Sequence, residues 1–289
     1  MALEQDERSG PRVGNRSSRI LGGSGGARSA AIAAVSTLVF FGVLVLVVVN
    51  APNWPEVEEQ FFNWEVFKNS LPDIAEAFKT NVKLFLIAEV FILVLALFLA
   101  VLRGLPGPVF FPLRVLSTAY TDVFRGIPTI LLVYLLGFGI PGLQLHGVPN
   151  SQFFWAAVAL VLVYSAYVAE VYRAGIESIH PSQSAAARSL GLTHAQSMRY
   201  VVLPQAVRRV IPPLLNDFIG LQKDTALVAF LGVIDAFNQA QIDSAATFTY
   251  GAYLAAAALF VAITIPLARF TDWLIARDRR RRQAAGGFA

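Results

Sequence analysis

The sequence contains no cysteine among its 289 residues, which excludes disulfide bonds, thiolate metal sites and cysteine nucleophiles. Its three histidines, His146, His180 and His194, are too scattered to indicate a metal site. Charged residues are scarce, because they make up 15% of the chain whereas a soluble domain carries about 25%. Together with 56% hydrophobic residues, this composition is typical of a polytopic membrane protein.

Motifs of several enzyme and transporter classes are also missing. The sequence has no G-x-x-x-x-G-K-[ST] phosphate loop, which agrees with a chain that binds no nucleotide itself. It has neither a nucleophile–base constellation nor an H-E-x-x-H zinc motif, which argues against an intramembrane enzyme. No internal repeat is evident, which weakens the case for an inverted-repeat secondary transporter.

The sequence does contain apolar runs long enough to cross a bilayer, which takes about 20 residues. We expect six spans, at 30–49, 82–102, 115–140, 153–171, 211–235 and 251–270. No small-residue cleavage site follows the first run, so we expect it to remain as a span. The predicted fold class is therefore all-α, a polytopic integral membrane protein with about six transmembrane helices.

The charges around these runs predict the orientation of the chain. Arginines are concentrated in the polar N-terminal segment 1–29, which we expect to be disordered, in the loop 172–210 and in the tail 272–289. Beside membrane spans, such runs indicate cytoplasmic segments rather than a nucleic-acid site, so both termini should be cytoplasmic. The acidic and aromatic segment 50–78 suits the outer face, and 79–271 forms the core of the protein.

One stretch of the cytoplasmic loop, "AAARSLGLTHAQSMRYVVLPQA", starts at Ala185 and predicts two short helices around a turn. Upstream of it, His180 and Pro181 can start the first helix, because proline fits the first helical turn. Gly191 should end that helix, because glycine tolerates the left-handed conformation of a helix C-terminus.

Thr193 should cap the second helix, and Gln196 completes a capping box with it, while Pro204 marks an end or a kink. A glycine between two short helices also suits a DNA-binding helix-turn-helix, but the flanking spans leave little room to reach a groove. A plain connection is another alternative, although most connections are much shorter. We therefore interpret the pair as a docking site for a cytoplasmic partner.

This stretch resembles the EAA loop of ABC importer permeases, whose pattern is E-A-A-x-x-x-G followed by I-x-L-P. The residues that the resemblance assigns to the ATPase-coupling loop are Ala185, Ala186, Ala187, Leu190, Gly191, Leu203 and Pro204. The runs "TDVFRGIPTILLVYLLG" and "AYVAEVYRAGIESIHPSQ…" resemble the polar amino-acid subfamily, whereas 1–78 is not covered. Ala185 replaces the glutamate of the motif, so docking should depend on shape and apolar burial more than on charge.

The resemblance implies the partners of the chain. The loop would be seated in a groove of a cytoplasmic ABC ATPase, which would use ATP and Mg, while this chain would bind no cofactor. A second permease (itself or a sister chain), an extracytoplasmic amino-acid-binding protein and an inner-membrane location are implied as well. The substrate would be a polar amino acid, with glutamate or glutamine as our first choice. The alternative is an ion-coupled secondary amino-acid transporter that uses Glu89 or Asp224 as its ion site.

Polar residues within the predicted spans indicate a substrate path, because a charge at the bilayer centre costs about 2.5–3.5 kcal/mol. The candidates are Arg125, Tyr164, Tyr167, Glu170, Lys223, Asp224, Thr225 and Glu89. Three of them, Lys223, Asp224 and Thr225, match the K-D-T of the family pattern K-D-T-S-L. Arg125 lies in "FRGIP", where the helix should bend or open.

Each candidate also has a purely structural interpretation. Lys223 could snorkel to an interface while Asp224 caps a break in its span. The tyrosines could form a packing stripe, Glu89 could turn towards a bundle partner, and Arg125 could hold the helix break. The sequence leaves these alternatives open.

Overall fold

The structure, a computed structural model, describes residues 26–286, and these contain helices and no strand. The chain divides into two compact units between Glu59 and Gln60, and each unit is considered by itself. Disorder was predicted for 1–29, and residues 1–25 of this segment lie outside the described residues. The last four residues of the segment, 26–29, are helical, because α1 already begins at Gly26.

The first unit contains helix α1 (Gly26–Val49) and most of helix α2 (Trp54–Phe61). The side chains of α1 that the structure describes are all exposed, and they are almost all apolar. A helix of this length and composition can cross a membrane, as predicted for 30–49.

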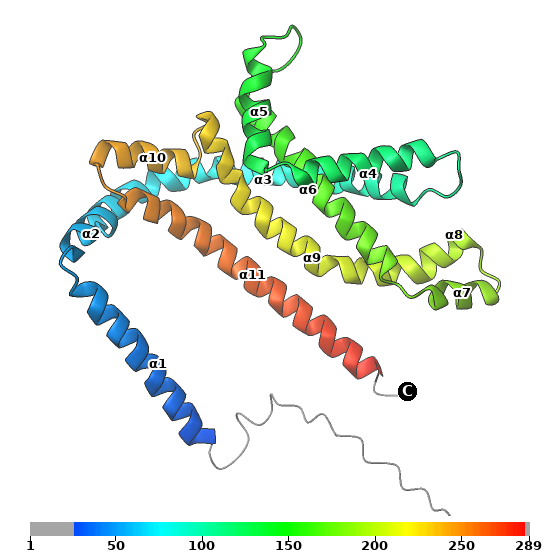
Figure 1. The fold of residues 1–289 in the computed structure, drawn as a ribbon, viewed down its shortest axis with the longest axis horizontal. Helices are drawn as coiled ribbons and strands as arrows, with labels where there is room; N and C mark the ends of the chain where they lie inside the picture. Colours follow the sequence, from blue (N-terminus) through cyan, green and yellow to red (C-terminus); the bar gives the residue numbers. More distant parts are fainter. Residues whose placement is uncertain (1–25, 287–289) are drawn as a thin grey trace, which may run out of the picture. The chain divides into compact units, whose positions relative to one another are not determined.

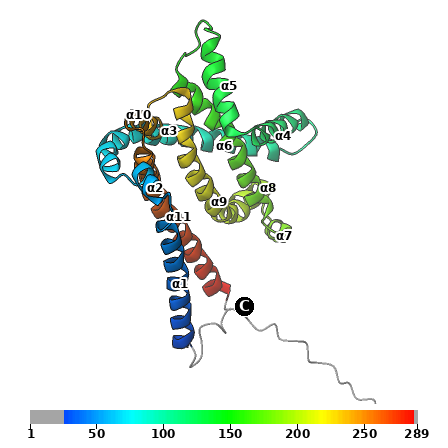
Figure 2. The ribbon, with the colours of Figure 1, turned by 60° about the vertical axis from the view of Figure 1, so that its left-hand side comes forward.

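The second unit is a bundle of helices. Its elements are α3 (Trp64–Gly104), α4 (Phe111–Gly126), α5 (Thr129–Gly142), α6 (Gln152–Glu177), α7 (Pro181–Ser189), α8 (His194–Ser197), the π-helix η2 (Met198–Val202), α9 (Leu203–Asp224), the 3-10 helix η3 (Thr225–Leu231), α10 (Ala236–Thr247) and α11 (Gly251–Gly286). Figures 1 and 2 both show α6 and α9 converging on the hairpin of α7 and α8.

Within residues 26–286, four helices are long and apolar enough to cross a membrane, and up to six segments are if each bent pair counts as one span. The prediction of an all-α membrane protein with about six spans is therefore confirmed. Helix α3 is longer than the predicted span 82–102, since Asn63 caps it and its side chain accepts a 3.1 Å hydrogen bond from the Val66 amide. Helix α11 likewise continues through most of the predicted tail 272–289, because arginine and alanine favour helix.

Two predicted spans are broken rather than continuous. The span 115–140 consists of α4 and α5, which meet at 98°. The bend falls at Ile127 and Pro128, since a residue before proline is driven out of the helical region and Ile127 has a ψ of 129°. The bend predicted within "FRGIP" is therefore confirmed.

The second broken span is 211–235. Its helical part ends at Leu231, and Gly232 follows in the left-handed region with a φ of 76°. Helix α10 then starts at an angle of 51°, capped by Asp235, whose carboxylate accepts a 2.8 Å hydrogen bond from the Asn238 amide. The residue that caps this break is thus Asp235 and not Asp224.

A buried polar cluster holds this break against α3. Asn81 donates to the Asp235 carboxylate at 2.8 Å and to the Thr225 hydroxyl at 3.3 Å. The carbonyl of the same side chain accepts from the Ala236 amide at 3.0 Å. Because all of these groups are buried away from water, each requires a partner inside the protein.

The main apolar core lies between α3, α5, α6 and α9. Leu84, Ala88 and Ile92 on α3 are fully buried, and they pack with Leu160 of α6 and Leu221 of α9. Helix α6 contributes many small residues to this core, which lets the neighbouring helices approach closely. The core therefore fixes α6 and α9 side by side, and these two helices carry most of the candidate site.

Candidate functional site

Helix α7 begins and ends as its sequence predicts. His180 is its N-cap, with Nδ1 accepting from the Ser182 amide at 3.2 Å. At the other end Gly191 adopts a φ of +88° and donates to the Arg188 carbonyl at 3.0 Å, while the Leu192 amide donates to the Ala187 carbonyl at 3.2 Å. These two bonds are those of a Schellman motif, which requires a left-handed residue at the position of Gly191.

The second helix of the hairpin starts with the predicted capping box. The Thr193 hydroxyl accepts from the Gln196 amide at 3.3 Å, and the Gln196 side chain accepts from the Thr193 amide at 2.9 Å. Beyond α8 the helical structure does not end at Pro204. It passes through one π-helical segment, Met198–Val202, and Pro204 then lies in the first turn of α9, where its missing N–H costs little.

The hairpin is anchored to both α6 and α9. A Cβ atom placed on Gly175 of α6 would lie 2.0 Å from Cγ1 of Val210 on α9, so the two helices touch at this point. Below the contact, Ile179, Val202 and Ala206 form a small buried cluster. A displacement of α7 and α8 would therefore move the ends of α6 and α9 that adjoin the hairpin.

Most of the predicted coupling residues are accessible. Six of them are exposed, namely Ala185, Ala186, Leu190, Gly191, Leu203 and Pro204. Leu190 stands out because 85% of its surface is exposed, although it is apolar. By contrast Ala187 is buried at 4% and packs inside the hairpin. The hairpin thus presents an apolar tip with few charges, on a rigid, doubly capped support.

Farther along α6 and α9, Tyr164 and Asp224 are brought together. The Tyr164 hydroxyl donates a 2.9 Å hydrogen bond to Oδ2 of Asp224. The same hydroxyl lies 3.2 Å from the position that a Cβ on Gly220 would occupy, so a glycine leaves room for the tyrosine here. Positions 217, 220 and 224 follow one face of α9, and this face is turned to α6.

Two further carboxylates within the predicted spans, Asp217 and Glu89, lie on α9 and α3. Asp217 lies one helical turn before Gly220, and its Oδ2 is buried without a hydrogen-bond partner among the described residues. Glu89 is half-buried on α3, a helix that packs against α9 where the Phe85 and Phe218 rings are 4.5 Å apart. Asp217 was not among the residues predicted from the sequence, although its position as an acidic residue within the predicted span 211–235 was an available signal.

Arg125 lies at the break between α4 and α5, next to the second tyrosine of α6. Its guanidinium lies 5.6 Å from the centre of the Tyr167 ring, and the Tyr167 hydroxyl donates to the Arg125 carbonyl at 3.4 Å. The rings of Tyr164 and Tyr167 are 6.3 Å apart. Two neighbouring tyrosines therefore connect an exposed cation, Arg125, with a half-buried anion, Asp224.

Glu170, also on α6, forms ion pairs with two arginine side chains. It accepts from Nη2 of Arg173 at 2.7 Å and from Nε of the same residue at 3.0 Å, and it forms an ion pair with Arg103 at the end of α3. Arg103 also donates to the Thr121 hydroxyl of α4 at 3.3 Å. This network links three helices, and the sequence did not reveal Arg103 as a partner of Glu170.

The three residues of the K-D-T motif point in different directions. Lys223 is exposed, Asp224 faces Tyr164, and Thr225 is buried and donates to the Gln222 carbonyl at 2.7 Å. Successive residues of a helix are about 100° apart, so they cannot share one site. Only Asp224 of the three therefore contacts the tyrosine pair. No group of His, Asp or Glu suited to a metal ion occurs among the described residues.

Comparison with known proteins identifies the family to which this sequence and fold are similar. The family model described as "Binding-protein-dependent transport system inner membrane component" matches residues 108–280. The chain is 39% identical over 169 residues to "Probable glutamine ABC transporter permease protein GlnM" of Bacillus subtilis strain 168, a match that covers 57% of this chain and 76% of that protein.

Two further similarities agree with this match. The chain is 36% identical to "Glutamate/aspartate import permease protein GltK" of Escherichia coli O6:H1, with 62% of this chain and 81% of the relative covered. It also resembles a solved structure titled "Crystal structure of an amino acid ABC transporter with histidines", with a TM-score of 0.65 and 32% identity, over 71% of this chain and 94% of the other. The chain therefore belongs to the family of inner membrane components of binding-protein-dependent transport systems, and it is a membrane-spanning permease of the ABC transporter type.

Proposed function

We propose that this chain is the permease subunit of an ABC importer that carries a polar amino acid across the cytoplasmic membrane. The relatives named for glutamine and for glutamate and aspartate support a polar amino acid as the substrate, with glutamate or glutamine first. They do not support the ion-coupled transporter that the sequence left open. In this proposal both termini face the cytoplasm.

One observation carries the proposal of an amino-acid path. The tyrosine pair of α6 connects the guanidinium of Arg125 with the carboxylate of Asp224 over two ring contacts. An amino acid presents a carboxylate and an ammonium group, which are complementary to these two charges. In this arrangement Arg125 receives the substrate carboxylate, while Asp224 and its neighbour Asp217 receive the ammonium group.

Coupling to ATP hydrolysis is assigned to a partner. The exposed apolar tip of the α7–α8 hairpin would be seated in a cytoplasmic ATPase, which binds ATP and Mg, while this chain binds neither. Because the hairpin is anchored on α6 and α9, closure of the ATPases would move the helices that carry Tyr164 and Asp224. The ligand-bound ATPase can drive this motion only by binding the two states of the hairpin differently.

The remaining partners complete the transporter. A second permease, either another copy or a sister chain, would form the other half of the path. An extracytoplasmic binding protein would deliver the substrate, in keeping with the description of the family.

Uptake of a panel of labelled amino acids tests this function. Cells with and without the chain are compared while ATP and the proton gradient are depleted separately. We expect the loss of uptake of one or two polar amino acids, and we expect the residual transport to follow ATP. Uptake that follows only the ion gradient would overturn the proposal in favour of a secondary transporter.

A further inference from the structure

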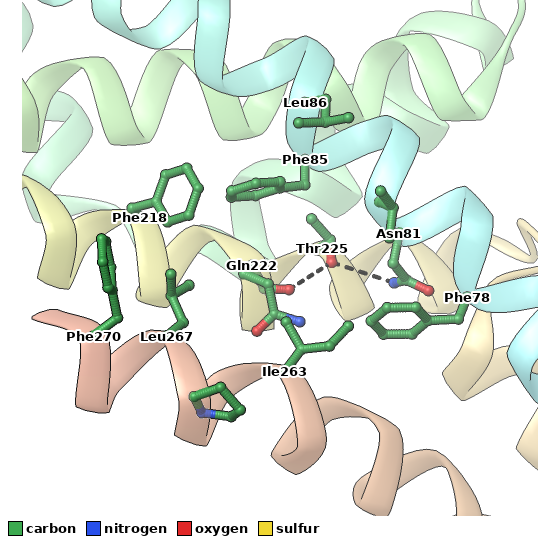
Figure 3. Close-up of a pocket in the computed structure, with 12 residues that line it drawn as sticks. Phe78, Asn81, Phe85, Leu86, Phe218, Gln222, Thr225, Ile263, Leu267 and Phe270 are labelled. Carbon is green, nitrogen blue, oxygen red and sulfur yellow. Dashed lines mark hydrogen bonds between the residues drawn. The ribbon is translucent and has the colours of Figure 1, made fainter.

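A cavity of about 560 Å³ lies between α3, α9 and α11 (Figure 3), and neither tyrosine of the pair lines it. Its walls are mostly aromatic and aliphatic. They include Phe78, Phe85, Phe218, Ile263, Leu267 and Phe270. The volume falls within the range of sites that bind small organic molecules, roughly 300–1,000 Å³.

Helix α9 serves this cavity and the substrate path with different faces. Phe218 and Gln222 of α9, with Thr225 at the start of η3, line the cavity. Asp224 instead belongs to the face of α9 that is turned towards Tyr164 of α6, and Asp217 lies two turns earlier on the same face. A ligand in the cavity would therefore not enter the path of the transported amino acid.

The floor of the cavity holds an unused hydrogen-bond donor. Gln222 is only 6% exposed, and its side-chain carbonyl accepts from the Thr264 hydroxyl at 2.9 Å. Its Nε2 is buried and has no partner among residues 26–286. Figure 3 shows this amide beside Ile263 and Thr225, at the base of the apolar walls. A buried N–H without an acceptor is costly, so the site lacks an oxygen that a ligand can supply.

The neighbouring polar groups do not need such an oxygen. Asn81 donates to the Thr225 hydroxyl at 3.3 Å, and Thr225 in turn donates to the Gln222 backbone carbonyl at 2.7 Å. The ligand that fits therefore has one acceptor for Gln222 and is otherwise apolar.

The rim of the cavity is exposed at the surface of this chain. Val82, Leu86 and Phe270 are 40%, 58% and 51% exposed, and they belong to helices that can cross the membrane. Lys79 precedes Val82 by one helical turn on the same edge of α3 and is exposed. Because Lys79 and its ion-pair partner Glu76 are both charged and exposed, we expect the water-facing end of the rim here, at the level of lipid headgroups and acyl ester carbonyls.

We propose that the cavity binds one ester-linked acyl chain of a membrane phospholipid, whose carbonyl oxygen accepts a hydrogen bond from Nε2 of Gln222. The acyl chain fills the apolar walls, and the headgroup lies at the level of Lys79. A transmembrane helix of a second copy fits less well, because its backbone carbonyls are used within the helix and would leave Gln222 without an acceptor.

Native mass spectrometry of the full chain tests this site. The purified protein is stripped of lipid and reloaded with phosphatidylglycerol that carries either ester-linked or ether-linked chains. We expect one retained lipid per chain and a preference of about two- to tenfold for the ester form, the effect of one hydrogen bond. In Gln222→Met, which keeps the volume and removes the donor, both lipids should be retained equally.

Filling the cavity provides a second variant. Leu267→Trp should abolish retention of the lipid, whereas Leu97→Trp, a substitution at a 56% exposed position of α3 that does not line the cavity, should leave it unchanged. A wild-type protein that retains no lipid, or that retains both lipids equally, would overturn the proposal. The proposal would also be overturned if the chain forms a dimer in which the second copy, and not a lipid, covers the cavity.

Discussion

The hydroxyl of Tyr164 on α6 donates a 2.9 Å hydrogen bond to the carboxylate of Asp224 on α9. This contact joins the two helices between which the α7–α8 hairpin lies in the chain. A motion of the hairpin therefore reaches the groups that we assign to the substrate through two packed helices and not through a loop. Gly220 makes the contact possible, because a larger residue would meet the tyrosine hydroxyl.

Removal of the charge of Asp224 tests the path. We expect Asp224→Asn to lower uptake by about ten- to a hundredfold, because a hydrogen bond to a charged group contributes about 1.5–3 kcal/mol. Initial rates of uptake in membrane vesicles, normalised to protein level, measure this change. The matched control is Lys223→Gln at the adjacent exposed position, which should stay near wild type. An equal loss in both variants would contradict our assignment of Asp224.

A charged substitution at the tip of the α7–α8 hairpin tests whether this tip docks to the ATPase. We expect Gly191→Asp to abolish uptake while the protein remains inserted, because a charge then lies on the apolar docking surface. Gly107 is a matched control, since it also has a positive φ, of +92°, and open space around it, but it lies in the α3–α4 turn. Co-purification of the ATPase with each variant measures docking. Normal uptake by Gly191→Asp would refute docking through this hairpin.

The contact between α6 and α9 at Gly175 can be tested by comparing how alanine at this glycine and at Gly139 changes the stability of the protein. Gly175→Ala should destabilise the protein by about 1–3 kcal/mol, because its Cβ would overlap Val210. Gly139→Ala, in an open helical position of α5, should be neutral or slightly stabilising. Thermal unfolding in detergent measures both.

A compensating substitution completes this test. The double variant Gly175→Ala/Val210→Ala should recover part of the stability lost in Gly175→Ala, because the smaller side chain makes room for the added methyl group. If the second substitution only adds to the loss, the two residues are not in direct contact.

The polar cluster at the break before α10 should be costly to disturb. Asn81→Leu would leave the Asp235 carboxylate, the Ala236 amide and the Thr225 hydroxyl with fewer partners. Each buried group left unpaired costs about 1–3 kcal/mol, so we expect a clear drop in the unfolding temperature. Asn150→Leu in an exposed loop is the control and should change it little.

Local features of this protein could be predicted because the groups involved are close along the chain. The cap of α7, the left-handed Gly191 and the capping box of Thr193 and Gln196 depend on contacts within five residues. The bend at Pro128 follows from the proline ring and its preceding residue. The six apolar runs likewise follow from composition, since only helices of about 20 residues can satisfy their backbone inside a bilayer.

The sequence by itself determined the class of the protein, the caps of the two hairpin helices, the bend at Pro128 and the place of the α7–α8 hairpin along the chain. Only the tertiary structure decided which polar groups meet: Asp224 with Tyr164, Arg103 with Glu170, and Asn81 with Asp235. These partners are separated by 60, 67 and 154 positions along the chain. The physical reason is that helical periodicity fixes which face of a helix a residue occupies, whereas the identity of the facing helix follows from the packing of the whole bundle.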